Sequence, residues 1–192
     1  MLEIPCVIFA GGKSSRMGED KALLPFASYS TLTEYQYQRL SKIFQHVYIS
    51  CKDASNFSFT ANFIEDSKAK ELYAPTAGFI AIFEAITDDR FFVISVDSPF
   101  INEAIITKLL SADSENVDAT IAKTAEGIQP LCGIYHRTLE HSFEKMFNEN
   151  NHKLGYLLKN SQTNYCIFKN STAFLNMNHP EDYKKALSLI NC

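Results

Sequence analysis

The segment with the clearest chemistry is residues 10–21, AGGKSSRMGEDK, which directly follows a short apolar run. Gly11 and Gly12 let a sharp turn aim successive backbone N–H groups at one ligand, while Arg16 and Lys21 add positively charged donors. A tight turn with solvated charges would explain the two glycines alone, but it does not explain the Ser, Arg and Lys that follow them. The segment therefore predicts a phosphate-binding loop.

Two common phosphate-binding motifs do not fit this loop. A Walker A sequence would need a glycine five positions before Gly12, where Val7 stands inside the apolar run. The dinucleotide fingerprint G-x-G-x-x-G is also absent, because the glycines lie at positions 11, 12 and 18. The sequence thus excludes a P-loop NTPase and disfavours a Rossmann dehydrogenase.

Carboxylates follow two of the other apolar runs. Asp97 comes after residues 91–96, and Asp66 closes the run that contains Phe63 and Ile64. In an open α/β sheet, ligands bind at the carboxyl ends of the strands, where the glycine-rich loop is also expected. Mg²⁺ is held by one or two carboxylates together with phosphate oxygens, so Asp97 is a candidate metal ligand. Taken alone, an Asp before Ser-Pro is more typical of a turn or a helix cap.

Strand-like and helix-like segments alternate along the chain. Runs rich in β-branched and aromatic residues predict strands, and intervening segments show helical spacing, the last of them beginning at Pro180. This alternation predicts one α/β domain over residues 1–192, a three-layer α/β/α sandwich with a Rossmann-like, mostly parallel sheet. We expect the last helix to dock on that sheet. The predicted strands are residues 4–9, 47–51, 91–96, 117–122 and 164–168, with a weaker one at 61–64.

Composition limits the possible partners and location. The 192 residues carry 18 Lys and Arg against 22 Asp and Glu, a formal charge of −4, which argues against nucleic-acid and anionic-membrane surfaces. No apolar run approaches the roughly 18 residues of a membrane span, and the first residues do not resemble a secretion signal. We expect a cytoplasmic monomer. The five cysteines and five histidines have neither zinc-ligand nor disulfide-framework spacing.

The loop resembles the A-G-G-x-S-x-R-M-G-x-D-K motif of the molybdenum cofactor guanylyltransferases, the MobA-like family of nucleotidyltransferases. The resemblance implies that the loop wraps the triphosphate of GTP and that Lys21 neutralises phosphate charge. It also implies that Asp97 binds Mg²⁺, since VDSPF is similar to the family's C-D-x-P-F segment with Val96 in place of cysteine. It assigns nucleotide contacts in the loop to Phe9, Ala10, Gly11, Gly12, Arg16 and Lys21.

Three further motifs extend the resemblance over nearly the whole chain. Asp66 and Gly78 match the family's E-D…P-L-x-G region, although Thr76 replaces the usual leucine, and Ser50 stands where some relatives have an asparagine. The resemblance implies that these residues meet the nucleotide. A Q-P-L-x-G-x-Y segment follows at residues 129–135, which local chemistry alone would explain as a strand. Asn176 and Asn178 match the closing N-x-N-x-P-E-D motif and are implied to lie near the pterin substrate, although Asn178 also suits a helix cap.

The implied reaction is transfer of GMP from GTP to the terminal phosphate of molybdopterin, with release of pyrophosphate and with Mg²⁺ as cofactor. Transient contacts with cofactor-biosynthesis proteins and molybdoenzymes would follow. Two alternatives stay open: a cytidylyltransferase acting on the molybdenum cofactor or on a sugar or polyol phosphate, and a nucleotide-binding protein of the same fold without catalysis. Retention of Arg16, Lys21 and Asp97 argues against the second.

Overall fold

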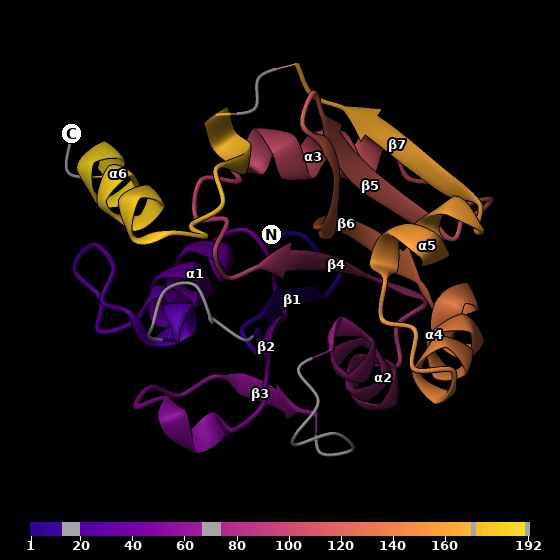
Figure 1. Ribbon diagram of the computed structural model, residues 1–192, viewed down its shortest axis with the longest axis horizontal. Helices are drawn as coiled ribbons and strands as arrows, with labels where there is room; N and C mark the ends of the chain where they lie inside the picture. Colours follow the sequence, from indigo (N-terminus) through magenta and orange to yellow (C-terminus); the bar gives the residue numbers. More distant parts are fainter. Residues whose placement is uncertain (13–19, 67–73, 170–171, 191–192) are drawn as a thin grey trace.

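A computed structural model of the chain describes residues 1–12, 20–66, 74–169 and 172–190. These residues form a seven-stranded sheet in the order β3-β2-β1-β4-β6-β5-β7 (Figure 1). β6 runs antiparallel to its neighbours β4 and β5, and the other adjacent pairs are parallel. The strands are β1 (Cys6–Phe9), β2 (Val47–Cys51), β3 (Asn62–Glu65), β4 (Arg90–Ser95), β5 (Ala119–Thr124), β6 (Gly127–His136) and β7 (Thr163–Ile167).

Helices cover both faces of this sheet. α1 and α3 pack on one face, and α2, α4 and α5 pack on the other (Figure 1). The three-layer sandwich with a mostly parallel sheet is therefore confirmed. The helices are α1 (Leu32–Leu40), α2 (Pro75–Ala85), α3 (Glu103–Ala112), α4 (Glu140–Asn148), α5 (Leu154–Lys159) and α6 (Pro180–Ile190), with short 3₁₀ turns η1 (Lys21–Leu23), η2 (Ala54–Asn56), η4 (Arg137–Leu139) and η5 (Thr172–Phe174).

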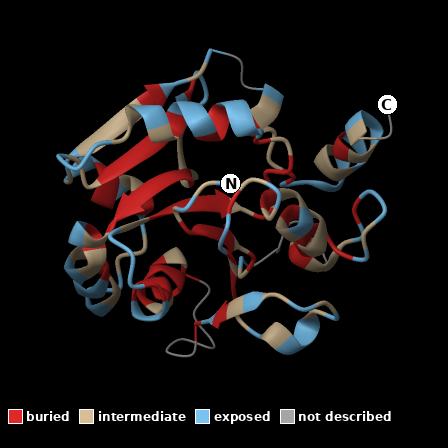
Figure 2. Cartoon of the chain, turned by 180° about the vertical axis from the view of Figure 1, so that it is seen from behind, coloured by how far each residue is buried: buried red, intermediate tan, exposed pale blue. Residues whose placement is uncertain are grey.

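The hydrophobic core has two halves, one on each side of the sheet. Side chains alternate along a strand, so Cys6 and Ile8 of β1 enter the core under α1 and α3, whereas Val7 enters the core under α2 and α4. Both faces of β1 are buried, as expected for a central strand of a parallel sheet that has helices on both sides. Figure 2 shows this burial along the central strands, with exposed residues on the outer faces of the helices.

The sequence located the strands to within two residues but missed features of the second half. β6 is longer than the strand suggested by residues 129–135, and α5 was not predicted. The expectation that α6 docks on the sheet is wrong, because Ala186 is its one buried residue and Tyr183 contacts Pro25 and Phe26, before α1. Thr31 is the N-cap of α1, and its side chain accepts a hydrogen bond from Glu34 N at 3.0 Å, whereas the Glu34 carboxylate accepts from Ser30 N and Ser30 Oγ.

An ionic cluster lies at the edge of the sheet where β4 begins and β6 ends. The Asp113 side chain is fully buried there, and its carboxylate accepts from Thr120 Oγ1 at 2.7 Å, contacts His136 Nε2 at 3.0 Å and pairs with Arg90. Burial alone would raise the pKa of Asp113, but the contacts with His136, Thr120 and Arg90 outweigh it and lower that pKa. The cluster ties α3, β4, β5 and β6 together.

The four cysteines among the described residues, Cys6, Cys51, Cys132 and Cys166, are all buried free thiols. Burial raises the pKa of Cys51 and of Cys132 to about 12 in each case, which keeps both thiols protonated. Within the described ranges, no helix is long and apolar enough to cross a membrane.

Candidate active site

A pocket lies at the carboxyl ends of the four adjacent parallel strands β3, β2, β1 and β4. This is the edge at which open α/β sheets bind ligands. Nine of the residues singled out from the sequence line it, and they come from stretches as distant as positions 9 and 97. The lining residues are Phe9, Ala10, Gly11, Gly12, Asp20, Lys21, Ala22, Ser50, Asp66, Ala74, Pro75, Gly78, Ser95, Val96, Asp97 and Leu131.

The start of the predicted phosphate loop continues the ladder of β1. Ala10 N donates to Ser50 O at 2.8 Å, and Val96 N donates to Phe9 O at 3.0 Å, so the loop leaves the sheet between β2 and β4. Arg16 and the rest of residues 13–19 lie outside the described residues.

No packing contact with the described residues requires glycine at positions 11 and 12. Among the described atoms, a Cβ at Gly12 would meet nothing within 4 Å, and one at Gly11 would come no closer than 3.7 Å to any neighbour. Neither has a left-handed backbone; in the described residues, Gly127 is the one glycine with positive φ. A left-handed backbone therefore does not account for glycine at these two positions, and the described atoms leave open space beside them.

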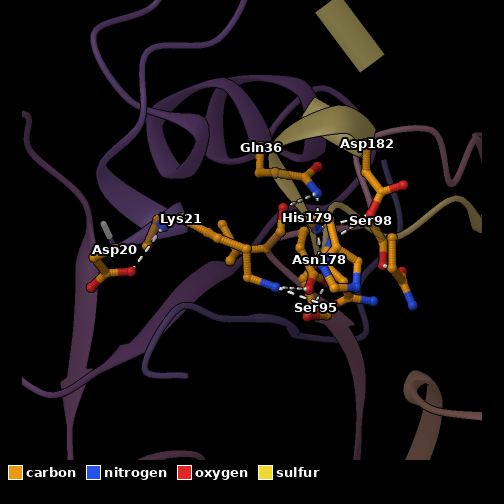
Figure 3. Close-up of polar contacts among 12 residues, drawn as sticks. Asp20, Lys21, Gln36, Ser95, Ser98, Asn178, His179 and Asp182 are labelled. Carbon is orange, nitrogen blue, oxygen red and sulfur yellow. Dashed lines mark hydrogen bonds and ion pairs between the residues drawn. The ribbon is translucent and has the colours of Figure 1, made fainter. Parts of the chain in front are cut away.

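Lys21 brings three distant segments together at one side of the pocket. It is the first residue of η1, whose N-cap Asp20 accepts a hydrogen bond from Ala22 N at 3.0 Å. From there Lys21 Nζ donates to Asp97 Oδ2 at 2.6 Å and to Asn178 Oδ1 at 3.2 Å (Figure 3). The Lys21 and Asp97 side chains are 17% and 13% exposed, so the pair is largely screened from bulk water yet open to the pocket.

Asp97 is held from both sides. Ser95 Oγ donates to Asp97 Oδ1 at 2.7 Å, and Met177 N donates to the Asp97 carbonyl at 3.1 Å. The buried Gln36 side chain donates to Val96 O at 3.1 Å and so fixes the end of β4 (Figure 3). These contacts leave a carboxylate of fixed position facing the pocket.

The donor set fits a hard divalent cation. Within the described ranges there is no cluster of three or more His, Cys, Asp and Glu that would enclose a metal by itself. Mg²⁺ does not need one, since it is usually held by one or two carboxylates together with water and substrate phosphates. Asp97 supplies such a carboxylate, and it is already fixed by Ser95 and Lys21.

The opposite side of the pocket is formed where α2 approaches β1 and β2. A Cβ on Gly78 would lie 2.7 Å from Phe9 Cε1 and 3.1 Å from Ser50 Oγ, so only glycine lets the first turn of α2 come this close. Ser50 is buried beneath it. Phe9, Ser50 and Gly78 thus form one continuous wall, and the protein's own packing requires glycine at position 78.

Asp66 occupies the same wall after β3. It is 6% exposed, and its backbone N–H donates to Cys51 O at 3.1 Å. Asp66 Oδ1 lies 2.9 Å from Lys52 Nζ. Burial raises the pKa of Asp66, and the ion pair with Lys52 opposes that rise.

The two asparagines of the closing motif lie outside this pocket and line a second, shallower one beside it. That pocket is bounded by Gln129 of β6 and by residues of the segment before α6. Asn176 Oδ1 accepts from Ser98 Oγ at 2.6 Å, and Asn178 contacts Lys21. Asn178 does not cap α6 with its side chain; instead Asp182 Oδ2 accepts from the backbone N–H groups of Asn178 and His179.

Several residues at the pocket were not found from the sequence. Ser95 contacts Asp97, and Lys52 contacts Asp66. Ser95 is the next-to-last residue of the predicted strand 91–96, and Lys52 directly follows the predicted strand 47–51, so their positions at strand ends were the signal that could have identified them. Leu131 lies beside the carboxyl end of β4, since the adjacent Cys132 pairs with Ile94, and the pairing of β6 with β5 skips from Gly133 to Gln129 around it. Pro130 within the skipped stretch cannot donate a ladder hydrogen bond, which was the local sign of this irregularity.

Comparison with known proteins agrees with this geometry. A family model described as a MobA-like NTP transferase domain matches residues 6–164. A protein of Campylobacter jejuni subsp. doylei named molybdenum cofactor guanylyltransferase is 39% identical over 183 residues, which cover 95% of this chain and 95% of that protein. A protein of the same name from Helicobacter pylori is 32% identical over 192 residues, covering 97% of this chain and 93% of that protein.

Solved structures share the fold. The molybdopterin-guanine dinucleotide biosynthesis protein A of Archaeoglobus fulgidus superposes with a TM-score of 0.82 at 22% identity, over 98% of this chain and 99% of that one. The 2-C-methyl-D-erythritol 4-phosphate cytidylyltransferase of Thermus thermophilus gives a TM-score of 0.73 at 15% identity, over 100% of both chains. With the loop, the strand-end carboxylates and the family match in agreement, the chain belongs to the MobA-like NTP transferase family.

Proposed function

We propose that the protein transfers GMP from GTP to the terminal phosphate of molybdopterin and releases pyrophosphate. The observation that carries this proposal is the meeting of Lys21, Asp97 and Asn178 at the mouth of the strand-end pocket, in a chain similar to proteins named molybdenum cofactor guanylyltransferase. A phosphate oxygen of the acceptor would attack the α-phosphorus of GTP. The bond from that phosphorus to the β-phosphate oxygen would break, and pyrophosphate would take its electron pair.

The protein's part in this reaction is alignment and charge neutralisation. A phosphate monoester is already an anionic nucleophile near neutral pH, so no covalent enzyme intermediate and no catalytic triad are needed. Lys21 would pair with phosphate oxygens, and Gly11 and Gly12 would let the backbone approach them. Arg16 is proposed to add a second positive charge to the same loop. Phe9, Ala10, Ser50, Asp66 and Gly78 would form the nucleotide side, and Asn176 and Asn178 the acceptor side.

Asp97 would hold Mg²⁺ in this proposal. The ion, when bound, supplies a Lewis acid that polarises phosphate oxygens. Ser95 would orient the Asp97 carboxylate, and Gln36 would keep the end of β4 in place. Lys21 also donates to the Asp97 carboxylate, so the cation and Lys21 would both be held by this one side chain.

Lys21→Met should lower the rate of pyrophosphate release from GTP in the presence of molybdopterin by about a hundredfold or more, because one donor to the transition-state charge is lost. Lys42→Met removes the same charge from an exposed position outside the pocket and serves as the control. Thermal unfolding would verify that both variants fold. Near-normal turnover of Lys21→Met would show that Lys21 has no part in the mechanism. Pyrophosphate release by the wild type with CTP but not with GTP would show that the proposed nucleotide substrate is wrong.

Asp97→Asn should shift the magnesium titration of the reaction to a much higher concentration, because an amide oxygen binds a hard cation more weakly than a carboxylate. The titration is measured at saturating GTP, with Glu103→Gln as the control, which removes a carboxylate from an exposed position outside the pocket. If Asp97→Asn kept the wild-type magnesium dependence, the metal ligand would have to be another residue.

We also propose a cytoplasmic location, a monomer and one folding domain over residues 1–192. Cofactor-biosynthesis proteins would deliver the acceptor through transient contacts, and molybdoenzymes would receive the product in the same way. The net charge of −4 supports the absence of nucleic-acid and membrane partners.

A further inference from the structure

Two residues that follow neighbouring strands, Lys52 after β2 and Asp66 after β3, form an ion pair at the pocket wall. Lys52 Nζ lies 2.9 Å from Asp66 Oδ1, and the two side chains are 16% and 8% exposed. The backbone hydrogen bond from Asp66 N to Cys51 O fixes the spacing of the two chain segments. The pairing of β2 with β3 therefore sets the geometry of this ion pair.

Asp66 faces the same pocket as the phosphate loop, which limits what it can bind. An ionised carboxylate is only an acceptor, so it repels phosphate oxygens and needs a hydrogen-bond donor. The donors of GTP are the ribose hydroxyl groups and the N–H groups of the guanine edge. Asp66 is therefore suited to the nucleoside part of the nucleotide, while Lys21 and the glycines are suited to its phosphates.

A carboxylate that is buried in this position is costly to ionise, and the positive charge of Lys52 reduces that cost. Burial raises the pKa of Asp66 and so favours its protonated form. A protonated Asp66 would lose part of its capacity to accept hydrogen bonds. Lys52 counters that tendency through its positive charge, which lies 2.9 Å from Asp66 Oδ1.

We propose that Lys52 is a positioning residue for the nucleotide, which keeps Asp66 ionised and oriented so that Asp66 accepts hydrogen bonds from the nucleoside donors of GTP. This inference rests on the proposed function. Lys52 acts through Asp66 and need not touch the reacting phosphates. Its aliphatic stem lies beside the phosphate loop, since a Cβ on Gly11 would be 3.8 Å from Lys52 Cγ.

Other ionisable groups surround Asp66 and belong in any account of its protonation. Glu65 precedes it on β3, where its carboxylate accepts from Ala54 N at 2.6 Å, and no charged side chain lies in the first turn of α2. Among the described residues, the ionisable side chains at and just after the end of β2 are Cys51 and Asp53. Those on the other side of the pocket are Asp20, Lys21 and Asp97.

The test is calorimetric binding of GTP with Mg²⁺ at a series of pH values from weakly acidic to weakly alkaline, because the raised pKa of Asp66 makes its ionisation depend on pH. The proteins are wild type, Lys52→Met, Lys52→Arg, Asp66→Asn and the double variant Lys52→Met/Asp66→Asn. Lys42→Met controls for loss of a positive charge at an exposed site. Each dissociation constant is divided by the wild-type value at the same pH, which cancels the titration of the GTP phosphates. Thermal unfolding at each pH verifies folding.

We expect Lys52→Met to weaken GTP binding about 10- to 100-fold at the acid end, as for loss of hydrogen bonds to a charged group. The defect should shrink as pH rises, because Asp66 then ionises without help. Lys52→Arg should restore most of the affinity. The double variant should be no weaker than Asp66→Asn and should show no such pH dependence. Unchanged affinity of Lys52→Met, or a loss that is the same at every pH, would overturn the inference.

Two nucleotide analogues identify which donor Asp66 meets. If the base is recognised, Asp66→Asn should lose little further affinity for ITP, which lacks the 2-amino group; if the ribose is recognised, the same holds for 2′-deoxy-GTP. An Asp66→Asn penalty undiminished on both analogues would overturn recognition through these groups. If wild type binds CTP tightly and GTP weakly, the proposed function fails, and the Lys52 series repeated with CTP still decides the role of Lys52.

Discussion

Lys21 contacts Asp97, 76 residues further along the chain, and Asn178, 157 residues further. One ammonium group therefore fixes the relative positions of the phosphate loop, the end of β4 and the segment before α6. Gly11 and Gly12, which line the same pocket, have no side chain to make such a contact between segments. The described protein atoms leave free space where a Cβ of Gly12 would lie.

This free space leads to a prediction that separates folding from binding. Gly12→Ala should leave the free energy of unfolding unchanged or raise it by about 0.5 kcal/mol, because alanine reduces the entropy of the unfolded chain. The same methyl group should weaken GTP binding about tenfold by blocking close approach of a phosphate. Chemical denaturation and calorimetry measure the two effects. A destabilised variant with wild-type GTP affinity would show that the glycine serves the backbone instead.

The sequence identified most residues of this site because chemistry and position coincide in them. Asp66, Asp97 and the loop each follow an apolar strand, and parallel strands bring their carboxyl ends to one edge. Lys52 and Ser95 were missed because their importance depends on a neighbour, Asp66 in one case and Asp97 in the other. A contact between side chains has no signature in a single sequence.

At the level of elements, β6 is the strand that the sequence described least well. It lies between β4 and β5 and runs antiparallel to both, and its pairing with β5 is interrupted after Gly133. Periodicity indicates that a segment is a strand, but it does not give the order or direction of strands in a sheet. α5 was missed for a related reason: it has six residues, too few to show a helical period.

Gly133 lies where β6 packs tightly against β5, and its replacement should be costly. A Cβ there would lie 2.4 Å from Thr120 O and 2.8 Å from Ile121 Cδ1, so backbone would have to move. Gly133→Ala should lower the free energy of unfolding by about 3 kcal/mol. Gly155→Ala is the matched control, because its Cβ would meet only Ile128 Cδ1, at 3.7 Å. Urea denaturation of both would decide; equal stabilities would mean that the sheet accommodates the methyl group.

At the level of the whole molecule, Asp113 links stability to pH. The pKa of Asp113 is lowered in the folded protein, so the folded state binds fewer protons than the unfolded state. The resulting stability is fully present above the unfolded value of about 3.9 and is lost as pH falls through that value toward the lower folded pKa.

Asp113→Asn should therefore reduce stability at neutral pH by about 2 kcal/mol, because a charged hydrogen-bond acceptor is lost. Below about pH 4 the difference from wild type should shrink. Unfolding midpoints measured from neutral to acid pH would show the two curves converging. Parallel curves would mean that Asp113 has the same pKa in both states. Because the cluster connects α3, β4, β5 and β6, a single cooperative transition is expected, in line with one domain.

The strand order divides the sheet into a parallel part, β3-β2-β1-β4, and a second part, β6-β5-β7, which contribute differently to the two pockets. β3, β2, β1 and β4 carry most of the strand-end pocket, whereas β6 supplies Leu131 to that pocket and Gln129 to the second pocket beside it. If these pockets hold the nucleotide and the acceptor as proposed, the acceptor site could change through the second half of the chain without rebuilding the nucleotide site. The fold is shared by proteins as unlike in name as a molybdopterin-guanine dinucleotide biosynthesis protein and a methylerythritol phosphate cytidylyltransferase, so the architecture alone does not set the substrate.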